Sequence, residues 1–100
     1  MLNFPAHLNR GIVLNQLGRS EEAIASYDEV LSIKPADPDA WYNRGVALFN
    51  LERYEESIAN YERALALTPS FYEAWFNRAT TLLKLDRSEE RSPVMTRCLR

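Results

Sequence analysis

Three asparagine side chains are the residues of this 100-residue chain best suited to specific chemistry, because Asn9, Asn43 and Asn77 recur at a constant spacing of 34 residues. An amide side chain offers two N–H donors and a carbonyl acceptor, so it can pair with the backbone of an extended peptide whatever side chains that peptide carries. The same amides can instead hydrate an open face or tie neighbouring helices together. The spacing alone leaves the binding role and the scaffold role open.

A row of arginines, Arg10, Arg44 and Arg78, follows the asparagines at the same spacing. Long arginine side chains often lie along apolar surface with the guanidinium in water, or pair with a neighbouring carboxylate. We interpret this row first as structural and second as an anion-binding stripe.

The other reactive residue types form no arrangement typical of catalysis. His7 lacks a nucleophile and a carboxylate beside it, and the three glycines are too scattered for a phosphate-binding loop. Ser20, Ser26 and Ser57 are placed as helix caps or surface residues. The lone Cys98 has no partner for a disulfide or a metal site. We therefore expect a protein that is not an enzyme and needs no cofactor.

Charge and hydropathy argue against two classes of partner. The formal net charge is -2, whereas a nucleic-acid-binding domain usually carries a basic stripe. No apolar run approaches the roughly 18 residues that a membrane-spanning helix needs. We expect no nucleic-acid partner, no membrane partner and a cytoplasmic location.

The 34-residue period extends beyond these two rows and indicates a repeated structural unit. The matching positions are Leu14, Leu48 and Leu82; Leu17, Leu51 and Leu85; Arg19, Arg53 and Arg87; Glu21-Glu22, Glu55-Glu56 and Glu89-Glu90; Tyr27 and Tyr61; Leu31 and Leu65; Pro35 and Pro69. A unit of this size cannot bury its apolar face alone, so neighbouring units must stack.

Each unit is predicted to be two helices joined by a tight turn. In the central copy, Trp41, Gly45 and Leu48 recur at i, i+4 and i+7, the spacing of one helix face. A second face follows after residue 54, with Ile58, Tyr61 and Leu65, and with Ala64 beside them. We expect the paired glutamates to open each second helix, where they meet the positive end of the helix dipole.

Caps and prolines predict where these helices begin and end. Asp37 is expected to cap the first helix of the central copy, with Pro38 at its first position. Ser70 and Glu73 have the spacing of a capping box for the third copy. Pro35 and Pro69 should end the second helices, because the residue before a proline avoids the helical conformation.

Small residues recur where the two helices of a unit would have to approach closely. Gly11, Gly45 and Ala79 occupy equivalent positions, and Tyr27 and Tyr61 are the large residues expected to fill the space that they leave. A glycine inside a helix costs about 1 kcal/mol relative to alanine, so its recurrence predicts a packing role.

The pattern Trp41, Gly45, Leu48, Ser57, Tyr61, Ala64 and Pro69 resembles the tetratricopeptide repeat, whose period is also 34 residues. The resemblance implies an all-α fold, a right-handed superhelical stack of helix-turn-helix repeats known as an α-solenoid. Residues 1–100 would form one domain with repeats 4–37, 38–71 and 72–100, the third incomplete or irregular. The function that it implies is protein–protein or protein–peptide binding on a concave helical surface.

In that family the first helix of each repeat lines the concave side, which implies a set of candidate ligand-binding residues. We expect the asparagines to form a ladder along a peptide, Tyr42, Phe49 and Phe76 to supply apolar contacts, and two acidic residues to favour a basic ligand residue. The candidate peptide-binding residues are Asn9, Asn43, Asn77, Tyr42, Val46, Phe49, Asn50, Phe76, Asp39 and Glu73.

One subtype of the family does not fit. Members that grip a C-terminal carboxylate use lysine, arginine and asparagine together on this surface, and only Asn43 matches that arrangement. Leu8 and Ile12 stand where the first repeat would need a lysine and an asparagine, and Glu73 and Asn77 where the third would need basic residues. We therefore expect this chain not to be a carboxylate-binding co-chaperone.

The repeat pattern stops after Glu90, where residues 91–100 replace the expected second helix of the third copy. Pro93 would break a helix continued through it at a cost of about 3 kcal/mol. We expect either a short or irregular helix with Ser92 as its cap or a frayed tail, and favour the helix.

This break would leave the apolar side of the third copy's first helix imperfectly covered. The exposed set is Trp75, Leu82, Leu83 and Leu85, and the cover available is Val94, Met95 and Leu99. An apolar patch of this kind often finds a partner. The alternative function is therefore a structural one, self-association through the C-terminal end by stacking or helix exchange. Two other interpretations stay open: the tail covers the patch, or the chain is a piece of a longer array.

Overall fold

The computed structural model describes the backbone of residues 4–90 and the side chains of residues 8–86. The chain forms α1 (Phe4–Gln16), α2 (Ser20–Ile33), α3 (Pro38–Asn50), α4 (Tyr54–Leu67) and α5 (Tyr72–Glu90). No strand occurs within these described residues. The predicted all-α stack of helix-turn-helix units is confirmed.

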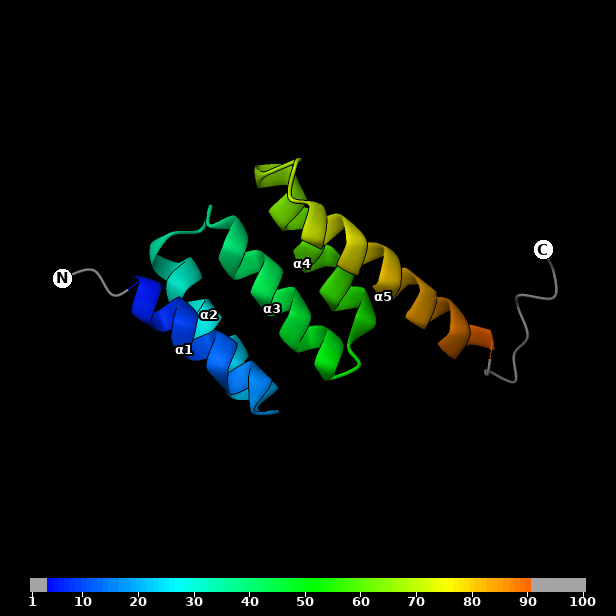
Figure 1. Cartoon of the computed structure of the whole chain (residues 1–100), viewed down its shortest axis with the longest axis horizontal. Coiled ribbons are helices and arrows are strands. Elements are labelled where there is room, and N and C mark those ends of the chain that lie inside the picture. The colour runs from blue at the N-terminus through cyan, green and yellow to red at the C-terminus, as the bar shows by residue number, and fades with distance from the viewer. Residues whose placement is uncertain (1–3, 91–100) are drawn as a thin grey trace.

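The five helices form two layers (Figure 1). Each helix packs against the next along the chain, and α3 also contacts α1 and α5. The first helices of the units, α1, α3 and α5, therefore form one layer, and α2 and α4 form the other. This arrangement brings residues 34 positions apart onto the same face of the molecule.

The helix boundaries around α3 follow the predicted cap and proline signals. The Asp37 carboxylate accepts hydrogen bonds from the backbone N–H groups of Asp39, at 3.0 Å, and Ala40, at 3.4 Å. Lys34 and Thr68, which precede Pro35 and Pro69, have φ of -133° and -138° and end α2 and α4 outside the helical conformation.

The paired glutamates lie in the first turns of α2 and α4, as predicted. The second glutamate of each pair also binds the arginine at the helix N-cap. Arg53 donates to both carboxylate oxygens of Glu56, at 2.6 and 3.0 Å, and Arg19 pairs with Glu22 in the same way. These bonds lower the pKa of both glutamates, but exposed pairs of this kind contribute little to stability.

The predicted fit between glycine and tyrosine is confirmed in both complete units. A Cβ atom built on Gly45 would lie 2.6 Å from Cε1 of the Tyr61 ring, and one on Gly11 would lie still closer to Tyr27. Both tyrosine side chains are fully buried, together with Leu48 in the core between the helices. The absence of a Cβ on the first helix therefore sets how closely the second helix packs.

The third unit differs from the prediction, because α5 continues through the expected turn. In the first two units the turn contains a residue with positive φ, Gly18 at 81° and Glu52 at 62°, whereas the equivalent Asp86 is helical. A left-handed residue other than glycine costs about 1–2 kcal/mol. In the second unit the burial of Tyr61 against α3 offsets this cost.

The sequence after Asp86 does not repeat the apolar pattern of α4, because Ser92 and Met95 stand where the second unit has Ile58 and Tyr61. The prediction that Glu89-Glu90 open a second helix is therefore wrong: they end α5 instead. The expected short helix or frayed tail, and the cover from Val94, Met95 and Leu99, lie outside the described residues.

The capping box predicted for Ser70 and Glu73 is also wrong. The cap position of α5 is Phe71, whose carbonyl accepts from the N–H groups of Ala74, at 3.1 Å, and Trp75, at 3.2 Å. Phe71 is the repeat counterpart of Asp37, so the period places the cap one residue after Ser70. The indole of Trp75 holds this connection by donating to the Pro69 carbonyl at 2.8 Å.

None of the described helices is long and apolar enough to cross a membrane.

Replacing Gly45 with leucine should lower the free energy of unfolding by about 3 kcal/mol, because the added side chain must displace the Tyr61 ring from the core. Chemical denaturation followed by circular dichroism would measure the change. Ala59→Leu, at an exposed position of α4, is the matched control and should change stability by less than about 0.5 kcal/mol. Equal stability of wild type and Gly45→Leu would contradict the packing described here.

Stability should fall at alkaline pH because burial raises the pKa of Tyr27 and Tyr61. Unfolded tyrosine ionises near pH 10, so the stabilising effect is complete below about pH 10 and is lost as pH rises toward the folded-state pKa values. The loss should approach about 1.4 kcal/mol per pH unit for each tyrosine that stays protonated. Urea unfolding across this range would measure it.

Tyr27→Phe is the control for this pH dependence. It should reduce the alkaline loss while leaving stability near neutral pH little changed, since the buried Tyr27 hydroxyl has no hydrogen-bond partner in the described part of the chain. An unchanged pH dependence in this variant would contradict the assignment.

Candidate functional site

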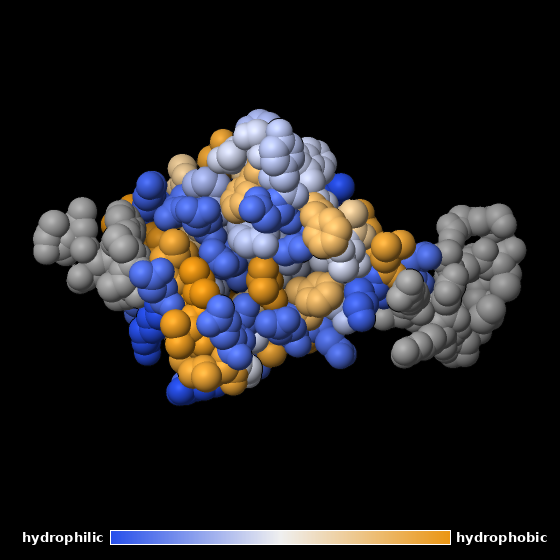
Figure 2. All heavy atoms as spheres, in the orientation of Figure 1, coloured by the Kyte–Doolittle hydropathy of each residue, from blue (hydrophilic) through white to orange (hydrophobic). Residues whose placement is uncertain are grey.

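A pocket of about 260 Å³ opens between α3 and α5 and unites half of the candidate residues predicted from the sequence. Its lining is Val46, Phe49, Asn50, Tyr61, Phe76, Asn77, Thr80 and Thr81. The predicted members are Val46, Phe49, Asn50, Phe76 and Asn77. Figure 2 shows that the face formed by α1, α3 and α5 mixes apolar and polar atoms.

Helix periodicity explains why these residues meet. Val46, Phe49 and Asn50 are at i, i+3 and i+4 on α3, so they share a side of that helix. Tyr61 reaches the floor of the pocket from α4, behind both helices. The sequence pattern predicts Tyr61 only as a core residue and does not place Thr80 among the candidates, although Thr80 is the repeat counterpart of Val46.

Asn77 joins α5 to α3. Its amide N–H donates to the Tyr42 hydroxyl at 2.9 Å. The Tyr42 ring is half-buried and packs against Phe71 and Tyr61, with ring centroids 4.8 and 5.8 Å away. Burial raises the pKa of Tyr42, the Asn77 bond lowers it and the charge of Glu73 raises it further. Tyr42, a predicted apolar contact for a peptide, is thus also part of the link between repeats.

Asn43 behaves differently although it is the repeat counterpart of Asn77. Its amide donates to the Asp39 carbonyl within α3, at 2.8 Å. The residue equivalent to Tyr42 in the first unit is Leu8, which has no hydroxyl to accept a bond from Asn43. Asn9 is exposed. The three amides are therefore not equivalent, and two of them use one of their N–H donors within the protein.

Asn50 makes a second link between units, from α3 to α1. Its amide donates to the Asn15 side-chain oxygen at 2.9 Å, and the Ser20 hydroxyl donates to the same oxygen at 2.7 Å. The repeat counterpart of Asn15 is Phe49, so the same position between α3 and α5 carries an aromatic ring. The Asn50–Asn15 bond therefore has no equivalent between α3 and α5, where Phe49 lines the pocket instead.

The walls of the pocket are otherwise held by local contacts. Phe49 packs edge-on against Tyr54 with ring centroids 5.4 Å apart. Phe76 is 71% exposed at the rim. The hydroxyls of Thr80 and Thr81 donate to the α5 carbonyls of Phe76 and Asn77, at 3.1 and 2.7 Å. Those two hydroxyl donors are therefore already used inside α5.

The arginine row links helices, which confirms its structural interpretation. Arg44 bridges two units: its guanidinium donates to Asp28 of α2 at 2.9 Å and to Asn60 of α4 at 3.0 Å. The equivalent bonds run from Arg78 to Glu62, at 3.0 and 3.1 Å, and from Arg10 to Ser26, at 3.1 Å. Asp28 and Glu62 are themselves repeat counterparts.

Acidic side chains mark one end of the α3–α5 surface. Asp39 and Glu73 lie in the first turns of α3 and α5, and both are exposed. Lys84 is exposed toward the other end of α5. The surface therefore runs from a negative end, past the pocket, to a single lysine on α5.

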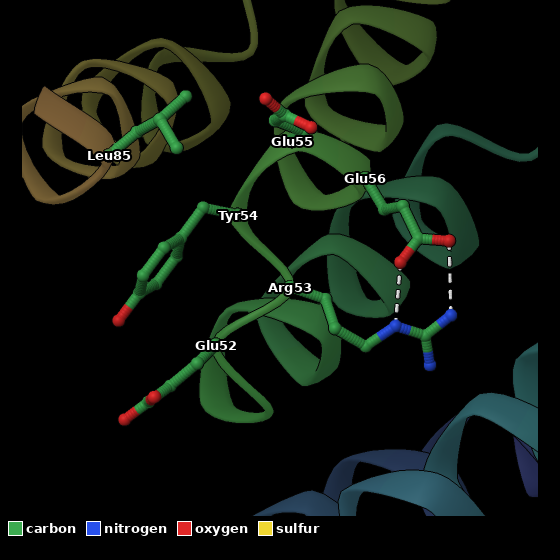
Figure 3. Close-up of a pocket in the computed structure, with 6 residues that line it drawn as sticks. All are labelled: Glu52, Arg53, Tyr54, Glu55, Glu56 and Leu85. Carbon is green, nitrogen blue, oxygen red and sulfur yellow. Dashed lines mark hydrogen bonds and ion pairs between the residues drawn. The ribbon is translucent and has the colours of Figure 1, made fainter. Parts of the chain in front are cut away.

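A larger recess of about 530 Å³ lies at the α3–α4 turn and is bordered by Leu85 of α5 (Figure 3). Arg53 is bound to Glu56 there, while Glu52 and Glu55 flank the opening. The equivalent positions of the first unit, residues 18–22 with Leu51, line a matching recess of about 240 Å³. Because both units have it, we assign this recess to the repeat architecture.

Metal-ligating side chains and the apolar residues of α5 were the two remaining features that the sequence singled out. Within the described residues, no group of His, Cys, Asp and Glu side chains converges to hold a metal ion. Trp75, Leu82 and Leu83 are 48%, 41% and 59% exposed, but the residues expected to cover them lie beyond the described part. The self-association hypothesis therefore stays untested.

Models of the tetratricopeptide repeat match the chain three times, over residues 11–52, 38–71 and 60–91. No curated protein sequence matches the chain.

Solved structures with the same fold include domains that bind peptides. The first such repeat domain of human RPAP3 is 26% identical, with a TM-score of 0.84 over 90% of this chain and 71% of that one. The first domain of Spaghetti (RPAP3), bound to the HSP90 peptide SRMEEVD, is 26% identical with a TM-score of 0.80, covering 84% of this chain and 67% of that one. MamA from Desulfovibrio magneticus is 25% identical with a TM-score of 0.78, covering 87% of this chain and 49% of that one.

The Asn77–Tyr42 bond should stabilise the packing of α5 on α3 by about 1 kcal/mol. Tyr42→Phe removes only the acceptor, so we expect a loss of this size in the free energy of unfolding, measured by urea denaturation. In an Asn77→Ala background the same substitution should have little further effect, because the two residues act as a pair. Additive losses in the double variant would show that the bond contributes nothing.

Proposed function

The chain belongs to the tetratricopeptide repeat family, and from this membership we propose that it is a protein-interaction module. It binds an extended peptide or protein segment on the surface formed by α1, α3 and α5. The observation that carries the proposal is the α3–α5 pocket, which brings Val46, Phe49 and Phe76 together beside the amides of Asn50 and Asn77. Apolar walls with a few placed polar groups are the usual composition of a ligand site.

The relatives support the same kind of function. The first domain of Spaghetti (RPAP3) binds a peptide of HSP90 and shares the fold of this chain over most of its length. The shared fold over most of this chain supports a binding role of the same general kind. The role proposed here is binding, without catalysis.

The asparagine ladder takes a modified form in this proposal. Asn43 and Asn77 each use one amide N–H inside the protein, and an amide carries a second N–H and a carbonyl oxygen. These remaining groups pair with the backbone of the ligand, while the internal bonds hold each amide in a fixed orientation. Fixing a side chain before binding reduces the entropy lost when the ligand arrives.

The ligand differs in charge from the HSP90 peptide. Arg44 and Arg78 are bound to Asp28 and Glu62 on the second helices, so their charge is directed away from the binding surface. Asp39 and Glu73 stand on that surface instead. A peptide ending in clustered carboxylates would be repelled there, whereas a basic or neutral one would not.

Selection of a randomised peptide library on immobilised protein, followed by fluorescence anisotropy with the selected peptides, would test the proposal. We expect binding to wild type and a loss of about tenfold or more in affinity for Asn43→Ala/Asn77→Ala, equivalent to about 1.4 kcal/mol. Glu21→Ala/Glu55→Ala, two exposed residues of the second helices, is the matched control and should bind normally. If no peptide is selected, or if both double variants bind as wild type does, the proposed surface is wrong.

A further inference from the structure

The two gaps between first helices have different chemistry, although they are related by the repeat. Between α1 and α3 the amides of Asn50 and Asn15 meet at 2.9 Å and close the surface with a hydrogen bond. Between α3 and α5 the corresponding positions are Lys84 and Phe49. An aromatic ring cannot form that bond, and the α3–α5 gap contains the pocket instead.

The size and lining of this pocket fit one side chain. Its volume of about 260 Å³ is below the roughly 300–1,000 Å³ of a typical small-molecule site. Phe49 and Phe76 supply aromatic walls and Tyr61 the floor. Phe76 is 71% exposed, so an apolar group that enters the pocket removes apolar surface of the protein from water.

The charged residues of the surface add a second element of recognition. Asp39 precedes Val46 by seven residues on α3, as Glu73 precedes Thr80 on α5. At about 1.5 Å per residue, Asp39 lies roughly 10–16 Å along α3 from the pocket residues of that helix, and Glu73 lies roughly 4–12 Å along α5 from the pocket residues there. An extended peptide advances about 3.3 Å per residue, so the range of distances that both carboxylates share, roughly 10–12 Å, corresponds to three or four ligand residues.

We propose that the α3–α5 pocket binds one aromatic or branched aliphatic side chain of the ligand, and that Asp39 and Glu73 bind a basic residue three or four positions away. This inference rests on the proposed function and specifies its ligand. The partner is a protein segment that carries an apolar residue and a basic residue at this spacing.

An array of immobilised decapeptides would test the inference directly. Each peptide has a glycine–serine background with one phenylalanine and one arginine, and the array as a whole covers every separation between these two residues. Binding is measured with labelled protein. We expect the strongest signal at separations of three and four residues. Replacing the phenylalanine by serine should reduce affinity by about tenfold or more, the effect of losing one buried apolar side chain.

Two variants separate the pocket from the rest of the surface. Phe76→Ser should remove the preference for phenylalanine and keep the preference for arginine. Leu83→Ser, a comparably exposed residue of α5 outside the pocket, is the matched control and should keep both. If Phe76→Ser folds poorly, Thr80→Phe provides a second test. Its added ring fills the pocket, so this variant should also lose the preference for phenylalanine and keep the preference for arginine.

Charge reversal tests the second element. Asp39→Lys/Glu73→Lys should exchange the preference for arginine for one for glutamate, while Glu52→Lys at the α3–α4 turn should not.

The outcomes distinguish the two proposals. Binding that is independent of phenylalanine and arginine but is lost in Asn43→Ala/Asn77→Ala would overturn this inference and support the binding surface. An unchanged preference for arginine in Asp39→Lys/Glu73→Lys would overturn the charge assignment. Absence of binding to every array peptide and to the selected library peptides would overturn both proposals.

Discussion

The contact between a glycine on the first helix and a tyrosine on the second determines the geometry of each complete unit. Tyr61 occupies the space where Gly45 has no Cβ, and Tyr27 does the same opposite Gly11. Because the rings are fully buried between the helices, they set the distance between the two helices of each unit. The same contact sets the position of the pocket, since the Tyr61 ring that packs against Gly45 also forms its floor.

Polar bonds then join one unit to the next and determine which side chains remain for a ligand. Arg44 and Arg78 bind carboxylates of the preceding unit, so the positive charges of this row serve the stack. The resulting surface keeps Asp39 and Glu73 and lacks the basic set that an acidic peptide would need. The ion pairs of these arginines on one side of the first helices thus influence which charges are exposed on the other side.

Relatives with the same fold illustrate how a shared architecture can serve different ligands. Spaghetti (RPAP3) binds an acidic HSP90 peptide, whereas this chain carries the acidic side chains of Asp39 and Glu73 on the surface that contains the aromatic pocket. The same fold places equivalent sequence positions in the same arrangement, but the residue types at those positions determine which ligand can bind. The ligand proposed for this chain is therefore defined by an apolar and a basic residue.

The sequence by itself determined the features that repeat: the helix pairs, the cap at Asp37, the boundaries before Pro35 and Pro69, and the fit of Tyr61 to Gly45. These depend on neighbours within one unit, which the 34-residue period displays directly. Only the tertiary structure decided the features that do not repeat. Asn77 reaches Tyr42 whereas Asn43 meets no hydroxyl at Leu8, and α5 continues where two earlier helices turn. Each depends on a residue one unit away or on burial after the turn, which local periodicity does not reveal.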